Sequence, residues 1–229
     1  MKKMLIALTL GSLFCAPLSH AEDNSAAVKP DRISLFNVPL QCPAAPEIGC
    51  GSKAKPILAA LERDSTITEA WLNKAGTVLA VVGAENSTPE SRVKAVQSVL
   101  DKRDVTATGL KGTARDTALK DFESRSGWYR GGEVDQLSKQ EAGIIAARLV
   151  RRLQTKVSLS DEKAKALEAA FTDVFKRRFT GNSDKSKQTS LDQRNDELLK
   201  VAREHLDEKS IEALKEAVAP GLRPLPNEK

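Results

Sequence analysis

The chain has 229 residues, of which 40% are hydrophobic, 29% charged and 4% aromatic, and its formal net charge is +5. These values are typical of a globular, helix-rich protein with one large domain or two small ones. They exclude collagen-like, disordered and multi-span membrane proteins.

The first 21 residues have the pattern of a secretory signal peptide. Lys2 and Lys3 precede an apolar stretch over residues 4–18, and a small-residue cleavage site ends at Ala21. We therefore expect cleavage after Ala21 and export to the periplasm. The net charge would fall from +5 to +3, because the two lysines are lost. No second apolar run is long enough to predict a membrane span.

The predicted mature chain is poor in metal-binding side chains. It keeps Cys42, Cys50 and His205 and has no methionine. Met-rich copper carriers and His-rich zinc or copper carriers are therefore excluded. The chain also lacks a Gly-x-Ser-x-Gly nucleophile motif, and a Ser/His or Cys/His catalytic apparatus would depend on His205. We expect a binding protein and not an enzyme.

After a flexible arm over residues 22–31, the pattern predicts an α+β domain over residues 32–111. The expected elements are a strand at 33–38, a Pro-rich loop at 39–51, a helix from Ser52, strands at 66–72 and 77–82, a helix at 88–102 and a strand at 105–108. Thr88-Pro89-Glu90 is a strong helix start, with an N-cap residue, a proline at the first helical position and an acid. The order β-α-β-β-α-β is that of the ferredoxin-like fold, in which two helices cover one face of a four-stranded sheet.

Residues 112–219 predict an all-α domain, and residues 220–229 predict an extended tail. The expected helices are at 114–122, from 138 through 153, from 160 through 175, at 191–206 and at 210–218, with a polar loop over 180–190. Ser138-Lys139-Gln140-Glu141 matches a capping box, and Ser160 is the expected cap of the next helix. The predicted architecture is a ferredoxin-like domain followed by a helical domain.

Residues 42–53 contain both cysteines of the predicted mature chain. Cys50 lies two residues before Ser52, the expected N-cap, and is therefore at the positive end of a helix dipole. Lys53 and Lys55 add positive charge nearby. These features favour a thiolate, which is both a metal ligand and a nucleophile.

This order of elements with a cysteine-bearing first loop resembles the heavy-metal-associated domain of bacterial mercuric-ion carriers and copper chaperones. The resemblance covers about residues 32–110. That family has Cys-x-x-Cys in the first loop; here Cys50 matches one cysteine, and Lys53 or Glu47 stands at the other position. The second thiol, Cys42, is separated from Cys50 by seven residues. The resemblance implies that Cys42 and Cys50 bind a soft ion such as Hg(II), Cu(I) or Zn(II), with Lys53 offsetting negative charge.

Three interpretations of Cys42 and Cys50 remain open. An exported protein with two cysteines commonly has a disulfide; the alternatives are a two-thiolate metal site and a redox-active pair. A tetrahedral zinc site would need further ligands, from Glu47 or a second protomer. The preferred function is a periplasmic soft-metal-binding or carrier protein. The alternative is a chaperone-like or structural interaction module with a structural disulfide.

Other residues of the helical half predict packing or docking. His205 lies beside an apolar helix stripe and is expected to pack there. Trp128 and Tyr129, flanked by glycines, are expected to pin the helical domain to the first domain or to anchor a partner. Basic clusters at 148–152 and 176–178 predict a solvated face, or a surface for an acidic protein or a membrane surface; nucleic acid is not an expected partner.

Two helix starts carry a second, weaker resemblance. Residues 159–163 (Leu-Ser-Asp-Glu-Lys) and 206–210 (Leu-Asp-Glu-Lys-Ser) are similar to the Leu-Thr-x-x-Gln helix starts of periplasmic stress chaperones and metal-resistance sensors. Lys163 and Ser210 stand at the glutamine positions. This resemblance also implies a role in metal stress of the cell envelope.

Overall fold

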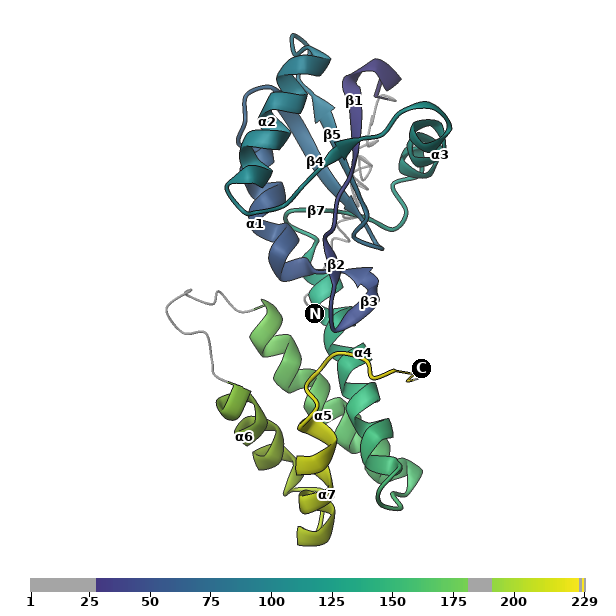
Figure 1. Cartoon of the computed structure of the whole chain (residues 1–229), viewed down its shortest axis with the longest axis vertical. Helices are drawn as coiled ribbons and strands as arrows, with labels where there is room; N and C mark the ends of the chain where they lie inside the picture. The colour runs from purple at the N-terminus through teal and green to yellow at the C-terminus, as the bar shows by residue number, and fades with distance from the viewer. Residues whose placement is uncertain (1–27, 181–190, 227, 229) are drawn as a thin grey trace, which may run out of the picture.

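The computed structural model describes residues 28–180, 191–226 and 228. The predicted signal peptide, most of the predicted arm and residues 181–190 of the predicted polar loop lie outside the described residues, whereas Thr180 is the last residue of a helix. Within the described part, a sheet with helices on both faces is joined by one long helix to a group of further helices (Figure 1). None of the described helices is long and apolar enough to cross a membrane.

The sheet has five antiparallel strands in the order β6-β1-β5-β4-β7. Their bounds are β1 Ile33–Asn37, β4 Ile67–Asn73, β5 Val78–Gly83, β6 Thr108–Gly109 and β7 Trp128–Arg130. The strand β5 lies in the middle, and its residues from Leu79 to Gly83 are all buried. A continuous apolar run forms this strand because both of its faces are covered by helices.

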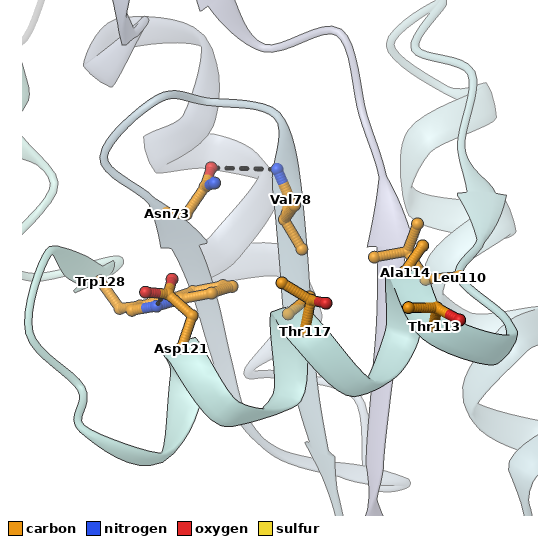
Figure 2. A pocket seen from close by; sticks show the side chains of 9 residues that line it. Asn73, Val78, Leu110, Thr113, Ala114, Thr117, Asp121 and Trp128 are labelled. Carbon is orange, nitrogen blue, oxygen red and sulfur yellow. Dashed lines mark hydrogen bonds between the residues drawn. The ribbon is translucent and has the colours of Figure 1, made fainter.

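Two helices, α1 (Gly51–Leu61) and α2 (Pro89–Asp101), cover one face of the sheet. The start of α2 is as predicted, since the Thr88 side chain accepts a hydrogen bond from the Ser91 backbone at 3.2 Å. The other face carries α3 (Gly112–Glu123), whose Phe122 packs edge-on against Trp128, with ring centroids 4.9 Å apart. A cavity of about 500 Å³ lies between α3 and the sheet, where the Trp128 indole donates to Asp121 (Figure 2).

This packing moves the boundary of the helical part. The helix α3 and the strand β7 belong with the sheet, although the helical domain was expected to begin at residue 112. Trp128 packs in the core between α3 and the sheet, and Tyr129 packs against the core that also contains Leu137 of α4. The local sequence could not show this, because a three-residue strand has too short a pattern to be distinguished from a turn.

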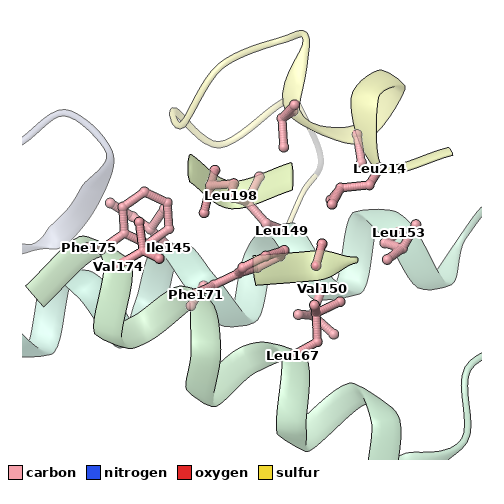
Figure 3. Packing of buried hydrophobic residues seen from close by; sticks show 14 of the residues in the cluster. Ile145, Leu149, Val150, Leu153, Leu167, Phe171, Val174, Phe175, Leu198 and Leu214 are labelled. Atoms are coloured by element: carbon pink, nitrogen blue, oxygen red, sulfur yellow. The ribbon is translucent and has the colours of Figure 1, made fainter. Parts of the chain in front are cut away.

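The helical part consists of α4 (Asp135–Gln154), α5 (Asp161–Thr180), α6 (Leu191–Ala202) and α7 (Glu208–Val218). Their shared core is built from fully buried leucines, phenylalanines and valines (Figure 3). The first turns of α4 instead pack against the sheet part, so this helix connects the two parts. Ser160 precedes α5 as predicted, and its side chain accepts from the Lys163 backbone.

Two predictions of local structure were wrong. The Pro-rich segment 39–51 is not a plain loop but contains a hairpin of β2 (Gln41–Cys42) and β3 (Ala45–Gly49). The apparent capping box at 138–141 does not begin a helix, because α4 begins at Asp135 and buries both Ser138 and Glu141. Packing of this helix against the hairpin and α1 decided its start, and not the local capping pattern.

Candidate metal centre

The hairpin β2–β3 places both cysteines on one face. Gln41 pairs with Gly49, and the Cys50 backbone amide donates to Leu40 at 2.7 Å, which extends the pairing by one residue. The register shifts between Gln41 and Cys42, where Cys42 pairs with Ala45, and the sulfurs of Cys42 and Cys50 lie within 4.8 Å of each other. The pattern is visible in the burial, since Leu40, Cys42 and Cys50 are buried while Gln41 is exposed. Seven intervening residues therefore let two cysteines meet across a hairpin, just as two intervening residues let them meet within a single loop.

Two glycines hold the hairpin against the turn between β4 and β5. The Gly49 amide donates to Lys74 at 2.7 Å, and the Leu40 amide donates to Gly76 at 2.9 Å. Gly76 has a φ of 72°, and a Cβ there would lie 2.5 Å from the Gly49 Cα. Only glycine satisfies both this backbone conformation and this close approach. The position of the cysteines is therefore set by the sheet.

The helix α4 adds a third group, Glu141. It approaches the start of α1 so closely that a Cβ on Gly51 would lie 2.4 Å from the Ser138 hydroxyl. Glu141 follows one helical turn later on the same face, where its Oε1 accepts a hydrogen bond from the Cys42 thiol at 3.0 Å. The other oxygen, Oε2, is buried and has no hydrogen-bond partner among the described residues. The two sulfurs and a Glu141 oxygen all lie within 4.8 Å of one another.

The charges of this cluster are unequal. The neighbouring Cys42 thiol lowers the pKa of Cys50 to about 5, aided by the Ser52 hydroxyl and by the backbone and charge of Lys53, and opposed by burial. The same contact, together with burial and the nearby Glu141, raises the pKa of Cys42. Burial raises the pKa of Glu141 to about 7. Without a bound ion, the cluster at neutral pH therefore holds one thiolate, one thiol and a partly protonated carboxyl group.

A cavity of about 390 Å³ opens onto the cluster. Its walls are Cys42, Cys50 and Glu141 on one side and Arg194 of α6 with tail residues 220–223 on the other. Both cysteines are free, and they are exposed by only 2% and 6%. The cavity therefore lies beside two sulfurs that are otherwise almost fully buried.

Two buried arginines of α4 hold the C-terminal tail beside this cavity. Arg148 donates to the carbonyls of Ala44, in the hairpin, and Leu222, in the tail. Arg152 pairs with both carboxylate oxygens of Glu228 at 2.7 Å, and it also donates to tail carbonyls. The prediction of a solvated basic face at 148–152 was therefore wrong for these two arginines, which are 5% and 6% exposed. A local charge pattern cannot show that tail carbonyls will cover it.

The structure brings together some predicted site residues and not others. Cys42 and Cys50 meet as the metal hypothesis requires, and Lys53 lies close enough to act on Cys50. Glu47 is exposed on the hairpin and is not part of the cluster. His205 follows α6 and is likewise not part of it.

Glu141 was missed as a site residue, because it is 99 positions from Cys42. One signal was present: a glutamate on the apolar face of a helix, beside Ala142 and Ile145, is unusual unless it has a partner.

The basic cluster at 176–178 is partly paired with another helix. Arg177 and Arg178 both contact Glu197 of α6, at 3.1 and 2.9 Å. These ion pairs join α5 to α6 near the cavity wall. Two of the three basic residues in this cluster are therefore paired within the chain, and their pairing needs no partner protein.

Comparison of the chain with protein-family models, with characterised proteins and with solved structures found no match. The case for a function therefore depends on the geometry of the cluster.

Proposed function

We propose that this is an exported protein that binds, and passes on, a thiophilic metal ion at Cys42, Cys50 and Glu141. The single observation that carries the proposal is the convergence of two sulfurs and a carboxylate oxygen within 4.8 Å at one buried point. Zinc binds sulfur at about 2.3 Å and carboxylate oxygen at about 2.0–2.2 Å, so ligands of one ion lie roughly 3–4 Å apart. Small rotations of these side chains are enough to reach that spacing.

The order of the strands supports the resemblance to heavy-metal-associated domains. The sheet neighbours β6-β1-β5-β4, with α1 and α2 on one face, are those expected of a ferredoxin-like domain. In this interpretation β7 is an addition at the sheet edge and α3 an addition on the second face. The cysteines also lie between the first strand and the first helix, as in that family, but a hairpin replaces the Cys-x-x-Cys loop.

The number of ligands favours a carrier over a structural site. Structural zinc sites have four protein ligands, whereas sites that exchange a ligand have three and an open position. The described residues offer three, and the cavity lies beside them. An exported carrier would use this opening to receive and release its ion.

One observation favours the alternative, a structural or chaperone-like module with a disulfide. The two sulfurs, one on β2 and one at the N-cap of α1, lie within 4.8 Å of each other, so oxidation would need little backbone movement. The helical part would then supply the surface for a partner protein.

Metal titration of the reduced protein tests the proposal. Wild type, Cys42→Ser and Cys50→Ser are titrated with Zn(II), Cu(I) and Hg(II) against a competing chelator, and stoichiometry is read by native mass spectrometry. Glu47→Gln is the control, because Glu47 is an exposed carboxylate in the same hairpin. We expect one ion per chain for wild type and the control, and affinity weakened about 100-fold or more by either serine.

Two results would overturn the proposal. The first is equal metal uptake by all four proteins, which would place any ion elsewhere. The second is a wild-type protein that binds no ion after full reduction; a bond that resists mild reductant would then identify the structural module.

A further inference from the structure

We propose that Glu141 is the third protein ligand and that it makes the site selective for a divalent ion of the zinc type over monovalent copper. This inference rests on the proposed function, since it concerns which ion the same site takes. It is carried by the position and surroundings of the carboxylate, which the cysteine pattern alone does not contain.

The first argument is the unsatisfied oxygen of Glu141. The residue is 94% buried, its Oε1 accepts from Cys42, and its Oε2 has no partner within the part of the chain that the structure describes. A buried carboxylate oxygen without a hydrogen bond or a cation is costly and is therefore rare in stable folds. An ion held by Cys42 and Cys50 would lie beside this carboxylate and remove that cost.

The second argument is the type of the donor atoms. Monovalent copper prefers sulfur and is satisfied by two thiolates, and a carboxylate adds little to it. Zinc is of intermediate softness and takes sulfur and carboxylate oxygen together. A carboxylate that α4 holds in contact with Cys42 is therefore useful for zinc and of little use for Cu(I).

The third argument is charge. Two thiolates and one carboxylate carry three negative charges when all are deprotonated, so a divalent ion leaves one and a monovalent ion leaves two. Buried net charge is unfavourable unless it is compensated. The described cations near the cluster are Lys53, Arg194, Arg223 and Arg148; Lys53 and Arg223 are exposed, Arg194 is half-buried, and Arg148 is already bonded to the carbonyls of Ala44 and Leu222. The complex with a divalent ion has the smaller residual charge and is therefore the more stable of the two.

Affinity measurements on a matched pair of glutamine variants test the inference. Zn(II) and Cu(I) affinities are measured by chelator competition for wild type, Glu141→Gln and Glu47→Gln. We expect Glu141→Gln to lose zinc affinity by about 100-fold while its Cu(I) affinity changes less than about threefold. Glu47→Gln should match wild type for both ions, because its side chain is exposed and outside the cluster.

Cobalt(II) in place of zinc provides a second readout that does not depend on affinity. The sulfur-to-cobalt charge-transfer absorption should persist in Glu141→Gln, since both cysteines remain, while the ligand-field bands should change with the lost oxygen ligand. Unfolding curves of the metal-free variants check that each one folds.

The outcomes separate this inference from the function on which it rests. Equal zinc affinity in wild type and Glu141→Gln, with binding still lost in Cys50→Ser, overturns the role of Glu141 and leaves the metal site standing. Equal losses for zinc and Cu(I) overturn the selectivity. Failure of the wild type to bind either ion overturns the proposed function itself.

Discussion

Replacing Glu141 by glutamine should stabilise the metal-free protein at neutral and alkaline pH. Burial raises the pKa of Glu141 from 4.5 to about 7, so the folded protein holds a proton that the unfolded chain has already released. The contribution of Glu141 to stability therefore falls as pH rises from about 4.5 to about 7, by on the order of 3 kcal/mol at most. Glutamine has a similar shape but does not titrate, and so it removes this cost.

The assay is urea unfolding of the reduced, chelator-treated protein at pH 4.5 and pH 8. We expect Glu141→Gln to be about 2–3 kcal/mol more stable than wild type at pH 8 and nearly equal to it at pH 4.5. The control, Glu47→Gln, should match wild type at both values because Glu47 is exposed. A Glu141→Gln variant that is less stable at pH 8, or whose difference from wild type does not depend on pH, would refute the argument.

Cys50 should give the opposite dependence on pH in the same experiment. Its pKa is lowered from 9.0 to about 5, so the folded state releases its proton earlier than the unfolded chain does. Its contribution to stability therefore grows as pH rises from about 5 to 9 and is lost as pH falls through about 5. In Cys50→Ser this rise in the free energy of unfolding should disappear, and the fall due to Glu141 should remain but become smaller, because the Cys50 charge is one cause of the raised Glu141 pKa. A rise that persists in Cys50→Ser would show that another group produces it.

Three further substitutions test the surroundings of the site. Gly51→Ala should lower the free energy of unfolding by on the order of 1–3 kcal/mol and weaken metal binding, because its Cβ would meet the Ser138 hydroxyl at 2.4 Å. In the same urea assay the control Gly143→Ala, whose Cβ would have no neighbour within 4 Å, should stabilise α4 by up to about 1 kcal/mol. Glu228→Gln should loosen the tail by removing its ion pair with Arg152, although the bonds from Arg152 to tail carbonyls remain, and should speed modification of the cysteines by a thiol reagent by up to about tenfold. An unchanged rate would show that this ion pair does not control access. Phe171→Ala should destabilise the helical core by about 3–5 kcal/mol in urea unfolding, and a cost below about 1 kcal/mol would contradict its full burial.

The hairpin explains how the chain can hold two cysteines together without the usual short spacing. In an antiparallel pair, residues on opposite strands become neighbours at a separation fixed by the turn length, and seven intervening residues are enough. Cys50 also stands at the N-cap of α1, one residue before the first helical position. The predicted N-cap was Ser52, so the cysteine lies nearer to the helix end than its local pattern indicated, and its thiolate gains from the helix amides.

The sequence by itself determined the elements whose signals are local. The apolar run at 77–82 predicted the central strand, and Thr88-Pro89-Glu90 predicted the start of α2, because side-chain periodicity and capping act within a few residues. The two cysteines were also identified as the candidate site from their type and position. These predictions needed no knowledge of what lies across the fold.

Tertiary structure alone decided which distant groups join the site. The addition of Glu141 to the cysteines depends on how α4 crosses the start of α1, a contact between segments about 90 residues apart. The burial of Arg148 and Arg152 depends in the same way on the tail that covers them. Such contacts are set by the packing of whole elements, and local periodicity and capping contain no information about their partners.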